Sequence, residues 1–218
     1  MGGAARDPQQ DAPRVRDLPA PRKNRSAAGG TIQRSMAWPY RAILAFLLWT
    51  GVRPWQLTML SLVLNVVSGG LILRGRWFAA GVVLLFAGCA DVFDGSVARQ
   101  RGTEGRSGAF MDSVLDRVSD TILFSTLFWV LAERGDATSA ALALVTLVVS
   151  LLVSHIRAEA EAAGLSLTEG FFQRLERFLA LMAGLVIPGA MRPVLIVLST
   201  LGAVTVLQRL WSAVRRLA

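Results

Sequence analysis

The sequence has few charged residues, one cysteine and one histidine. Only 17% of its 218 residues are charged, whereas soluble domains approach a quarter. Cys89 is the only cysteine, which excludes an internal disulfide and a thiol-based zinc cluster. His155 is the only histidine. Any metal site must therefore rest on carboxylates, which favour hard ions such as Mg²⁺, Mn²⁺ or Ca²⁺.

The apolar content is high, and it occurs in long runs. Apolar residues make up 53% of the chain, which predicts an all-α, polytopic membrane protein rather than a soluble core. The formal net charge is +8, but the basic stripe with interleaved aromatics that is typical of nucleic-acid binding is missing. We therefore expect no nucleic-acid partner and interpret the positive charge as contact with anionic membrane lipid.

The chain divides into a tail and one membrane domain. Residues 1–35 are rich in Pro, Gly, Ala and Arg, which predicts a disordered basic tail that is not a secretory signal. Residues 36–218 form the predicted membrane domain. Its first segment, Ala37 to Val52, is aromatic and short, which favours an amphipathic helix lying in the membrane interface. Six transmembrane helices are predicted to follow, at about 55–73, 77–99, 106–132, 138–162, 173–191 and 193–214.

The basic residues predict how the helices are oriented. With six spans and the tail inside, only four arginines fall outside: Arg74, Arg76, Arg134 and Arg192. The positive-inside rule therefore places both termini in the cytoplasm. We expect a bacterial inner-membrane location.

Two of the predicted spans reach full length only by including acidic residues. The apolar part of one, Trp77 to Ala90, has fourteen residues, and that of the next, Thr121 to Leu131, has eleven, whereas a span needs roughly 20. The missing length contains aspartates spaced by three or four residues, which places them on one helical face. These residues are Asp91 and Asp94 on the first helix, and Asp112, Asp116 and Asp120 on the second.

Antiparallel neighbouring helices joined by a short loop would bring four of these carboxylates together. Like charges at membrane depth repel and are costly to desolvate, so they bind protons or recruit cations. Two divalent ions would neutralise them in an arrangement suited to phosphoryl transfer. We expect Gly95 and Ala98 to leave this face open, Gly108 to allow close helix approach, and Arg99 to bind a phosphate.

The aspartates stand in a pattern that is specific to one family. Asp91-Val-Phe-Asp94-Gly95-Ser-Val-Ala98-Arg99, followed by Gly108, Asp112 and Asp116, resembles the signature D-x-x-D-G-x-x-A-R, about eight residues, G-x-x-x-D-x-x-x-D of the CDP-alcohol phosphatidyltransferases. The resemblance covers roughly residues 36–218. It implies a transferase that moves a phosphatidyl group from CDP-diacylglycerol to an alcohol and releases CMP.

The resemblance also implies roles for single residues. Two ions, Mg²⁺ or Mn²⁺, would be held by Asp91, Asp94, Asp112 and Asp116, and Asp116 would also be the catalytic base. The nucleotide would be bound by Asp91, Asp94, Gly95, Ala98, Arg99 and Gly108.

A second basic segment bears on the acceptor. The stretch Ser154 to Glu161, followed by Arg174 to Arg177, resembles a subset of the family that includes the actinobacterial phosphatidylinositol phosphate synthases and some phosphatidylglycerophosphate synthases. Arg157, Arg174 and Arg177 are the implied ligands of an acceptor phosphate. We rank inositol phosphate first as the acceptor. Glu159 stands where that subset has arginine, so glycerol 3-phosphate and, third, an unphosphorylated alcohol stay open.

Other classes of protein and the oligomeric state also stay open. Intramembrane carboxylates also occur in cation transporters, although here the acids cluster at one end of the helices beside glycine and arginine. A catalytically idle scaffold would be expected to have lost at least one aspartate of the signature. The exposed apolar faces are compatible with a homodimer.

Overall fold

The described part of the protein is helical throughout. The computed structural model describes Leu18, residues 29–165 and residues 174–217, with the backbone alone described at 29–37 and at 174 and 175. Seven helices occur in this part: α1 (Gly29–Trp49), α2 (Pro54–Leu73), α3 (Trp77–Arg101), α4 (Arg106–Glu133), α5 (Ala137–Ala162), α6 (Arg174–Val186) and α7 (Met191–Leu217).

Local sequence signals explain several of the helix ends. Pro54 stands in the first turn of α2, where its missing N–H has no helical partner to lose. Asp136 caps α5 by accepting a hydrogen bond from the Ser139 backbone N–H at 3.1 Å. Gly102 adopts φ 61° and ends α3, because glycine enters the left-handed region without a steric cost.

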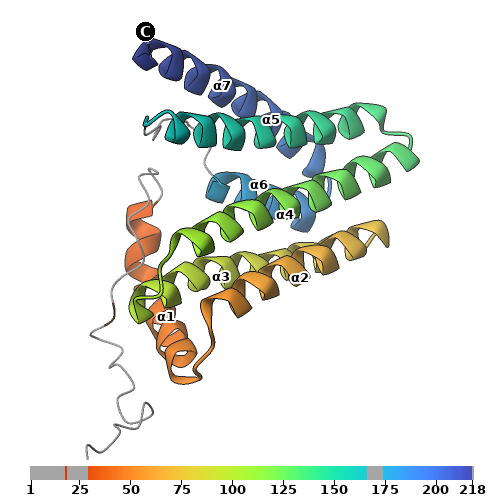
Figure 1. The fold of residues 1–218 in the computed structure, drawn as a ribbon. Helices are drawn as coiled ribbons and strands as arrows, with labels where there is room; N and C mark the ends of the chain where they lie inside the picture. The colour runs from red at the N-terminus through yellow and green to blue at the C-terminus, as the bar shows by residue number, and fades with distance from the viewer. Residues whose placement is uncertain (1–17, 19–28, 166–173, 218) are drawn as a thin grey trace, which may run out of the picture.

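Helices α2 to α7 pack into a closed ring (Figure 1). Helix α2 packs against α3 and α4, α5 packs against α4 and α7, and α6 packs against α3 and α7. Helix α1 contacts α3 and runs across the ends of the others (Figure 1). The end of the ring where α3 ends and α4 begins is called the site end below.

The predicted boundaries agree with most of the helices. Helices α2 to α5 begin and end within two residues of the expected positions. Helix α1 begins at Gly29 rather than at Ala37, so it reaches into the predicted disordered tail. The rest of that tail, apart from Leu18, lies outside the described residues. Helix α6 ends at Val186, five residues before its expected end, because Pro188 and Gly189 form a turn.

Four helices are long and apolar enough to cross a membrane: α2, α3, α5 and α7. Helix α4 is longer than any of them at 28 residues, but its first half carries the acidic residues described below. Helix α6 is described over 13 residues, which is about 20 Å of helix and short of a hydrocarbon core of about 30 Å. The described chain therefore shows a multi-pass membrane protein with four spans assignable by length and composition.

Some glycines lie where two helices are in close contact. A Cβ atom on Gly202 of α7 would lie 2.7 Å from Val149 of α5, and one on Gly81 of α3 would lie 2.6 Å from Val186 of α6. Small residues permit such contacts between membrane helices. Larger apolar side chains fill the rest of the interior, including Leu84, Phe124, Leu127, Leu195 and Leu198.

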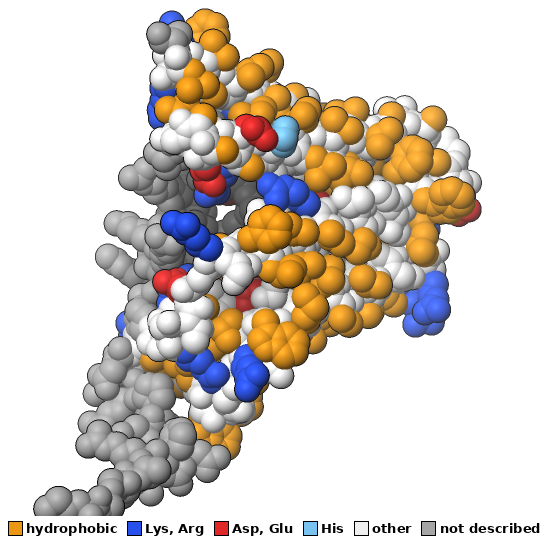
Figure 2. All heavy atoms as spheres, in the orientation of Figure 1, with side chains coloured by type: hydrophobic (Ala, Val, Ile, Leu, Met, Phe, Trp, Pro, Cys, Tyr) orange, Lys and Arg blue, Asp and Glu red, His pale blue; other side chains and the backbone are white. Residues whose placement is uncertain are grey.

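The outer surface is apolar in its middle and charged at its ends. Figure 2 shows hydrophobic side chains spread over the body of the bundle, with most charged groups gathered toward the site end. Large exposed apolar residues occur on all four assigned spans, for example Val63, Phe86, Val145 and Ile196. In water such a surface would favour aggregation, so we attribute it to contact with lipid.

Candidate functional site

Three aspartates meet at the site end. Carboxylate oxygens of Asp91 on α3, and of Asp112 and Asp116 on α4, all lie within 4.8 Å of one another. All three side chains are partly buried. Carboxylate oxygen is the ligand type that hard divalent cations prefer. The cluster is therefore suited to hold a divalent metal ion.

The helices that carry these aspartates do not pack directly against each other. Helices α3 and α4 are antiparallel and joined by a short loop, but over their described lengths they share no packing contact, and α2 packs against both. The expected meeting of carboxylates from two antiparallel helices therefore does not require these helices to pack directly against each other. The carboxylates meet because the aspartates at positions 91, 112 and 116 face one another across the space that separates the two helices.

The fourth aspartate of the motif is held from a third helix. Asp94 is only 7% exposed, and its Oδ2 atom accepts a hydrogen bond from the Thr58 hydroxyl of α2 at 2.8 Å. Asp94 is not one of the three aspartates whose oxygens converge within 4.8 Å. Because a carboxylate has two oxygens, Asp94 keeps one oxygen that this hydrogen bond does not occupy.

The remaining motif residues lie on the same end of α3 and α4. The Arg99 guanidinium folds back along α3 over Gly95, where a Cβ atom would lie 3.3 Å from Nη1. Asp91, Gly95 and Arg99 share one helical face, because they are four residues apart. Ala98 is partly buried beside them. Gly108 is exposed, and a Cβ atom there would meet nothing within 4 Å. The expectation that Gly108 permits close helix approach is therefore wrong.

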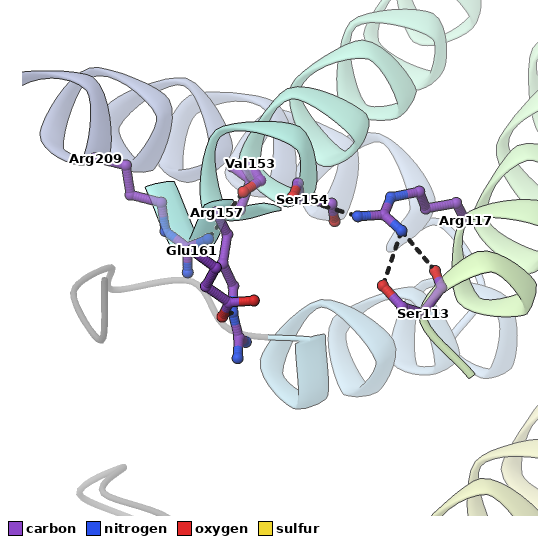
Figure 3. A network of polar contacts seen from close by, with 7 residues as sticks. All are labelled: Ser113, Arg117, Val153, Ser154, Arg157, Glu161 and Arg209. Carbon is purple, nitrogen blue, oxygen red and sulfur yellow. Dashed lines mark hydrogen bonds and ion pairs between the residues drawn. The ribbon is translucent and has the colours of Figure 1, made fainter. Parts of the chain in front are cut away.

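Several arginines gather around the end of α5. Arg157 is paired with Glu161 at 2.8 Å and is exposed. Figure 3 shows this pair beside Arg209 of α7, whose Nη1 atom donates to the Val153 carbonyl at 2.9 Å. The C-terminal end of α5 is thus bordered by one guanidinium group from α5 itself, that of Arg157, and one from α7, that of Arg209.

Arg117 of α4 reaches the same end of α5 from the other side (Figure 3). Its Nη1 atom donates to the carbonyl and hydroxyl oxygens of Ser113, and its Nη2 atom donates to the Ser154 carbonyl at 3.3 Å. All of these acceptors are neutral, so these hydrogen bonds do not neutralise the charge of Arg117.

Arg177 of α6 forms a part-buried ion pair with α4. Its Nη2 atom lies 2.8 Å from Oδ2 of Asp120, and the two side chains are 12% and 20% exposed. The same oxygen accepts a hydrogen bond from Ser150 of α5 at 2.8 Å. The side chain of Arg174 lies outside the described residues.

Sequence reasoning missed some of these side chains. Arg209 is a buried charge within a candidate membrane span, and such residues are functional candidates by default, so a signal for it existed. Asp120 was placed on the motif face but received no role. No sequence pattern indicated the contact of Thr58 with Asp94, because its two partners are 36 residues apart.

The comparison with known families agrees with this geometry. The model of the CDP-alcohol phosphatidyltransferase family matches residues 52–211, which include all of the converging aspartates. The chain belongs to this family.

Proteins of similar sequence include phosphatidylinositol phosphate synthases. The phosphatidylinositol phosphate synthase of Mycobacterium tuberculosis is 38% identical over 141 residues, which are 63% of this chain and 64% of that protein. The matched region thus spans slightly less than two thirds of that relative's length.

Solved structures of the phosphatidylinositol phosphate synthase from M. tuberculosis share the fold. One with CDP-DAG bound has a TM-score of 0.72 and 32% identity, and the alignment covers 79% of this chain and 92% of that one. A second, in complex with manganese and citrate, has the same TM-score and identity and covers 79% and 87%.

Proposed function

We propose that this protein transfers a phosphatidyl group from CDP-diacylglycerol to an alcohol, with inositol phosphate as the acceptor. The observation that carries the proposal is the convergence of Asp91, Asp112 and Asp116 within 4.8 Å at one end of an apolar helical bundle. The relatives support it, because a similar structure holds CDP-DAG and similar proteins are phosphatidylinositol phosphate synthases.

The aspartates would hold two divalent ions, Mg²⁺ or Mn²⁺. Asp91, Asp112 and Asp116 have the donor type and spacing that such ions need, and Asp94 would contribute the oxygen that Thr58 does not engage. Bound there, the ions would stabilise negative charge on the diphosphate and on the CMP leaving group. The manganese in a similar structure supports this assignment.

The protein's own side chains would perform the remaining steps. The carboxylate of Asp116 would accept the proton of the acceptor hydroxyl, as a general base. The acceptor oxygen then forms a bond to the phosphatidyl phosphorus, and the bond from that phosphorus to the CMP oxygen breaks. Arg99 would pair with the nucleotide diphosphate, while Gly95 and Ala98, together with Gly108, would leave room for the nucleotide.

The arginines around α5 would bind the phosphate of the acceptor. Arg157 was expected in this role, and the structure adds Arg117 and Arg209 beside the same helix end. Guanidinium groups favour phosphate because they offer paired donors at a fixed spacing. Arg177 would contribute to binding this phosphate while it keeps its ion pair with Asp120. The role of Arg174 in binding the acceptor stays a prediction.

The membrane arrangement completes the proposal. Helices α4 and α6 would complete six spans, with the site end and both termini in the cytoplasm. Helix α1 would lie in the interface, because it exposes Trp38, Phe46 and Trp49 while it buries Leu44. A homodimer stays a prediction.

The proposal is tested with the purified full chain in the presence of Mg²⁺. The assay measures the release of CMP from CDP-diacylglycerol. Inositol phosphate, glycerol 3-phosphate, inositol and serine would be offered separately. We expect release with inositol phosphate, and its loss in Asp116→Asn. Asp136→Asn, an isosteric change at the opposite end of the bundle, is the matched control and should retain turnover.

Two outcomes would count against the proposal. Release with glycerol 3-phosphate instead would keep the enzyme class and replace the acceptor. No release with any acceptor from a folded protein, combined with cation uptake by liposomes that contain it, would favour the transporter.

A further inference from the structure

Tyr40 of helix α1 contacts the motif helix α3 through both its ring and its hydroxyl. The Tyr40 ring stacks on Phe93 of α3, with ring centroids 5.2 Å apart and an interplanar angle of 20°. The Tyr40 hydroxyl donates a hydrogen bond to Oγ of Ser96 at 2.7 Å. Ser96 lies inside the D-x-x-D-G-x-x-A-R motif, at a position for which the motif requires no particular residue.

The Ser96 hydroxyl makes three hydrogen bonds and is only 3% exposed. It donates to the Val92 carbonyl at 2.8 Å. It accepts one hydrogen bond from Tyr40 and another from Nη2 of Arg99 at 3.0 Å. A hydroxyl has one proton and two lone pairs, so all of its capacity is used. The donation to Val92 turns both lone pairs toward Tyr40 and Arg99.

This contact restrains a long and otherwise exposed side chain. An exposed arginine samples many rotamers, and a ligand that needs one of them must order it at an entropic cost. Here Nη2 of Arg99 is held by Ser96, while its Nη1 lies over Gly95. The guanidinium is thereby kept on the helical face that also carries Asp91.

We propose that Tyr40 is a positioning residue, which holds the Arg99 guanidinium over the site through the Ser96 hydroxyl. The inference rests on the proposed function, in which Arg99 pairs with the diphosphate of the nucleotide. It adds a role for α1, because this helix exposes Trp38, Phe46 and Trp49 to its surroundings and also carries Tyr40.

The test removes single hydroxyl groups and measures nucleotide affinity. Tyr40→Phe keeps the ring on Phe93 and deletes only the donor, and Ser96→Ala deletes the shared acceptor. Thr200→Val on α7 is the matched control, because the Thr200 hydroxyl is exposed and bonds only within its own helix. For each purified protein, KM and kcat for CDP-diacylglycerol and the calorimetric Kd for CDP with Mg²⁺ would be measured.

We expect Tyr40→Phe to raise both KM and the CDP Kd about three- to tenfold, the range of one hydrogen bond, with kcat within about twofold. The double variant should resemble Ser96→Ala alone, because both changes interrupt one path. Constants equal to those of the wild type would overturn the proposal. A lower melting temperature with unchanged KM and Kd would show a structural role and would also overturn it. The CDP titration keeps this test separate from the proposed reaction, since it needs no turnover.

Discussion

Asp116 and Asp120 lie one turn apart on α4, and we expect their replacement by Asn to affect two different properties: the stabilisation by Mn²⁺ for Asp116, and the stability of the metal-free fold for Asp120. Asp116 is one of three carboxylates within 4.8 Å of one another. Without bound cations, each pair of such charges repels by roughly 3 to 4 kcal/mol at an effective dielectric constant of about 20. Asp120 instead faces the guanidinium of Arg177 at 2.8 Å.

The net effects are smaller than these pair energies. The three carboxylates are partly exposed, so solvent screening weakens their mutual repulsion, and Asp116→Asn should act chiefly by removing one negatively charged ligand from the metal site. For Asp120→Asn we expect a loss of about 2 to 3 kcal/mol, because the substitution leaves a mostly buried guanidinium without its carboxylate. A change of 1 kcal/mol shifts Tm by about 2 to 4 °C at this chain length.

The assay is thermal unfolding in detergent, with EDTA and then with Mn²⁺. In EDTA the Asp120→Asn variant should melt about 4 to 12 °C below the wild type. Added Mn²⁺ should raise the wild-type Tm, because a ligand of the folded state stabilises it, and should raise that of Asp116→Asn less. An unchanged Tm for Asp120→Asn in EDTA, or a response to Mn²⁺ that is equal in Asp116→Asn and the wild type, would refute the reasoning.

Three further predictions address packing, pH and the position of Asp94. Gly202→Ala should lower the Tm of thermal unfolding by several degrees relative to the wild type, because its Cβ would lie 2.7 Å from an α5 side chain. An unchanged Tm would contradict this prediction. Hydrogen bonding to Ser139 lowers the pKa of Asp136. The cap should therefore stabilise the protein at neutral pH, and this stabilisation should be lost as the pH falls below about 4. In unfolding measurements, the stability of Asp136→Asn should lack this dependence on pH. Thr58→Val should reduce turnover, measured by CMP release, about tenfold, and should reduce the Mn²⁺ affinity, measured by calorimetry, by a smaller factor. Unchanged turnover would show that Thr58 has no role in the site.

The order and type of the helices could be predicted from the sequence because they depend on local properties. Long apolar runs, proline at a helix start and glycine after a helix end each act within a few residues. The boundaries of α2 to α5 therefore agreed with expectation. The end of α6 did not, because the expected span continued through a proline-glycine turn.

The arginines of the acceptor region show what the sequence leaves undetermined. Arg157 and Arg177 are both expected to bind a phosphate, and in this structure each is paired with a carboxylate, Glu161 and Asp120 respectively. Arg117 received no role, although it reaches a backbone carbonyl of α5. Such pairings depend on which helices meet, and spacing along one helix does not determine that.

The sequence by itself determined the family, the helical class and the shared face of the aspartates, because motif spacing and helical period are properties of a continuous segment. Only the tertiary structure decided that α3 and α4 stay apart while Asp91, Asp112 and Asp116 converge. It alone also connected Tyr40 to Arg99 and Thr58 to Asp94. These contacts join residues distant in the chain, and they form only when the packing of the whole ring brings their helices together.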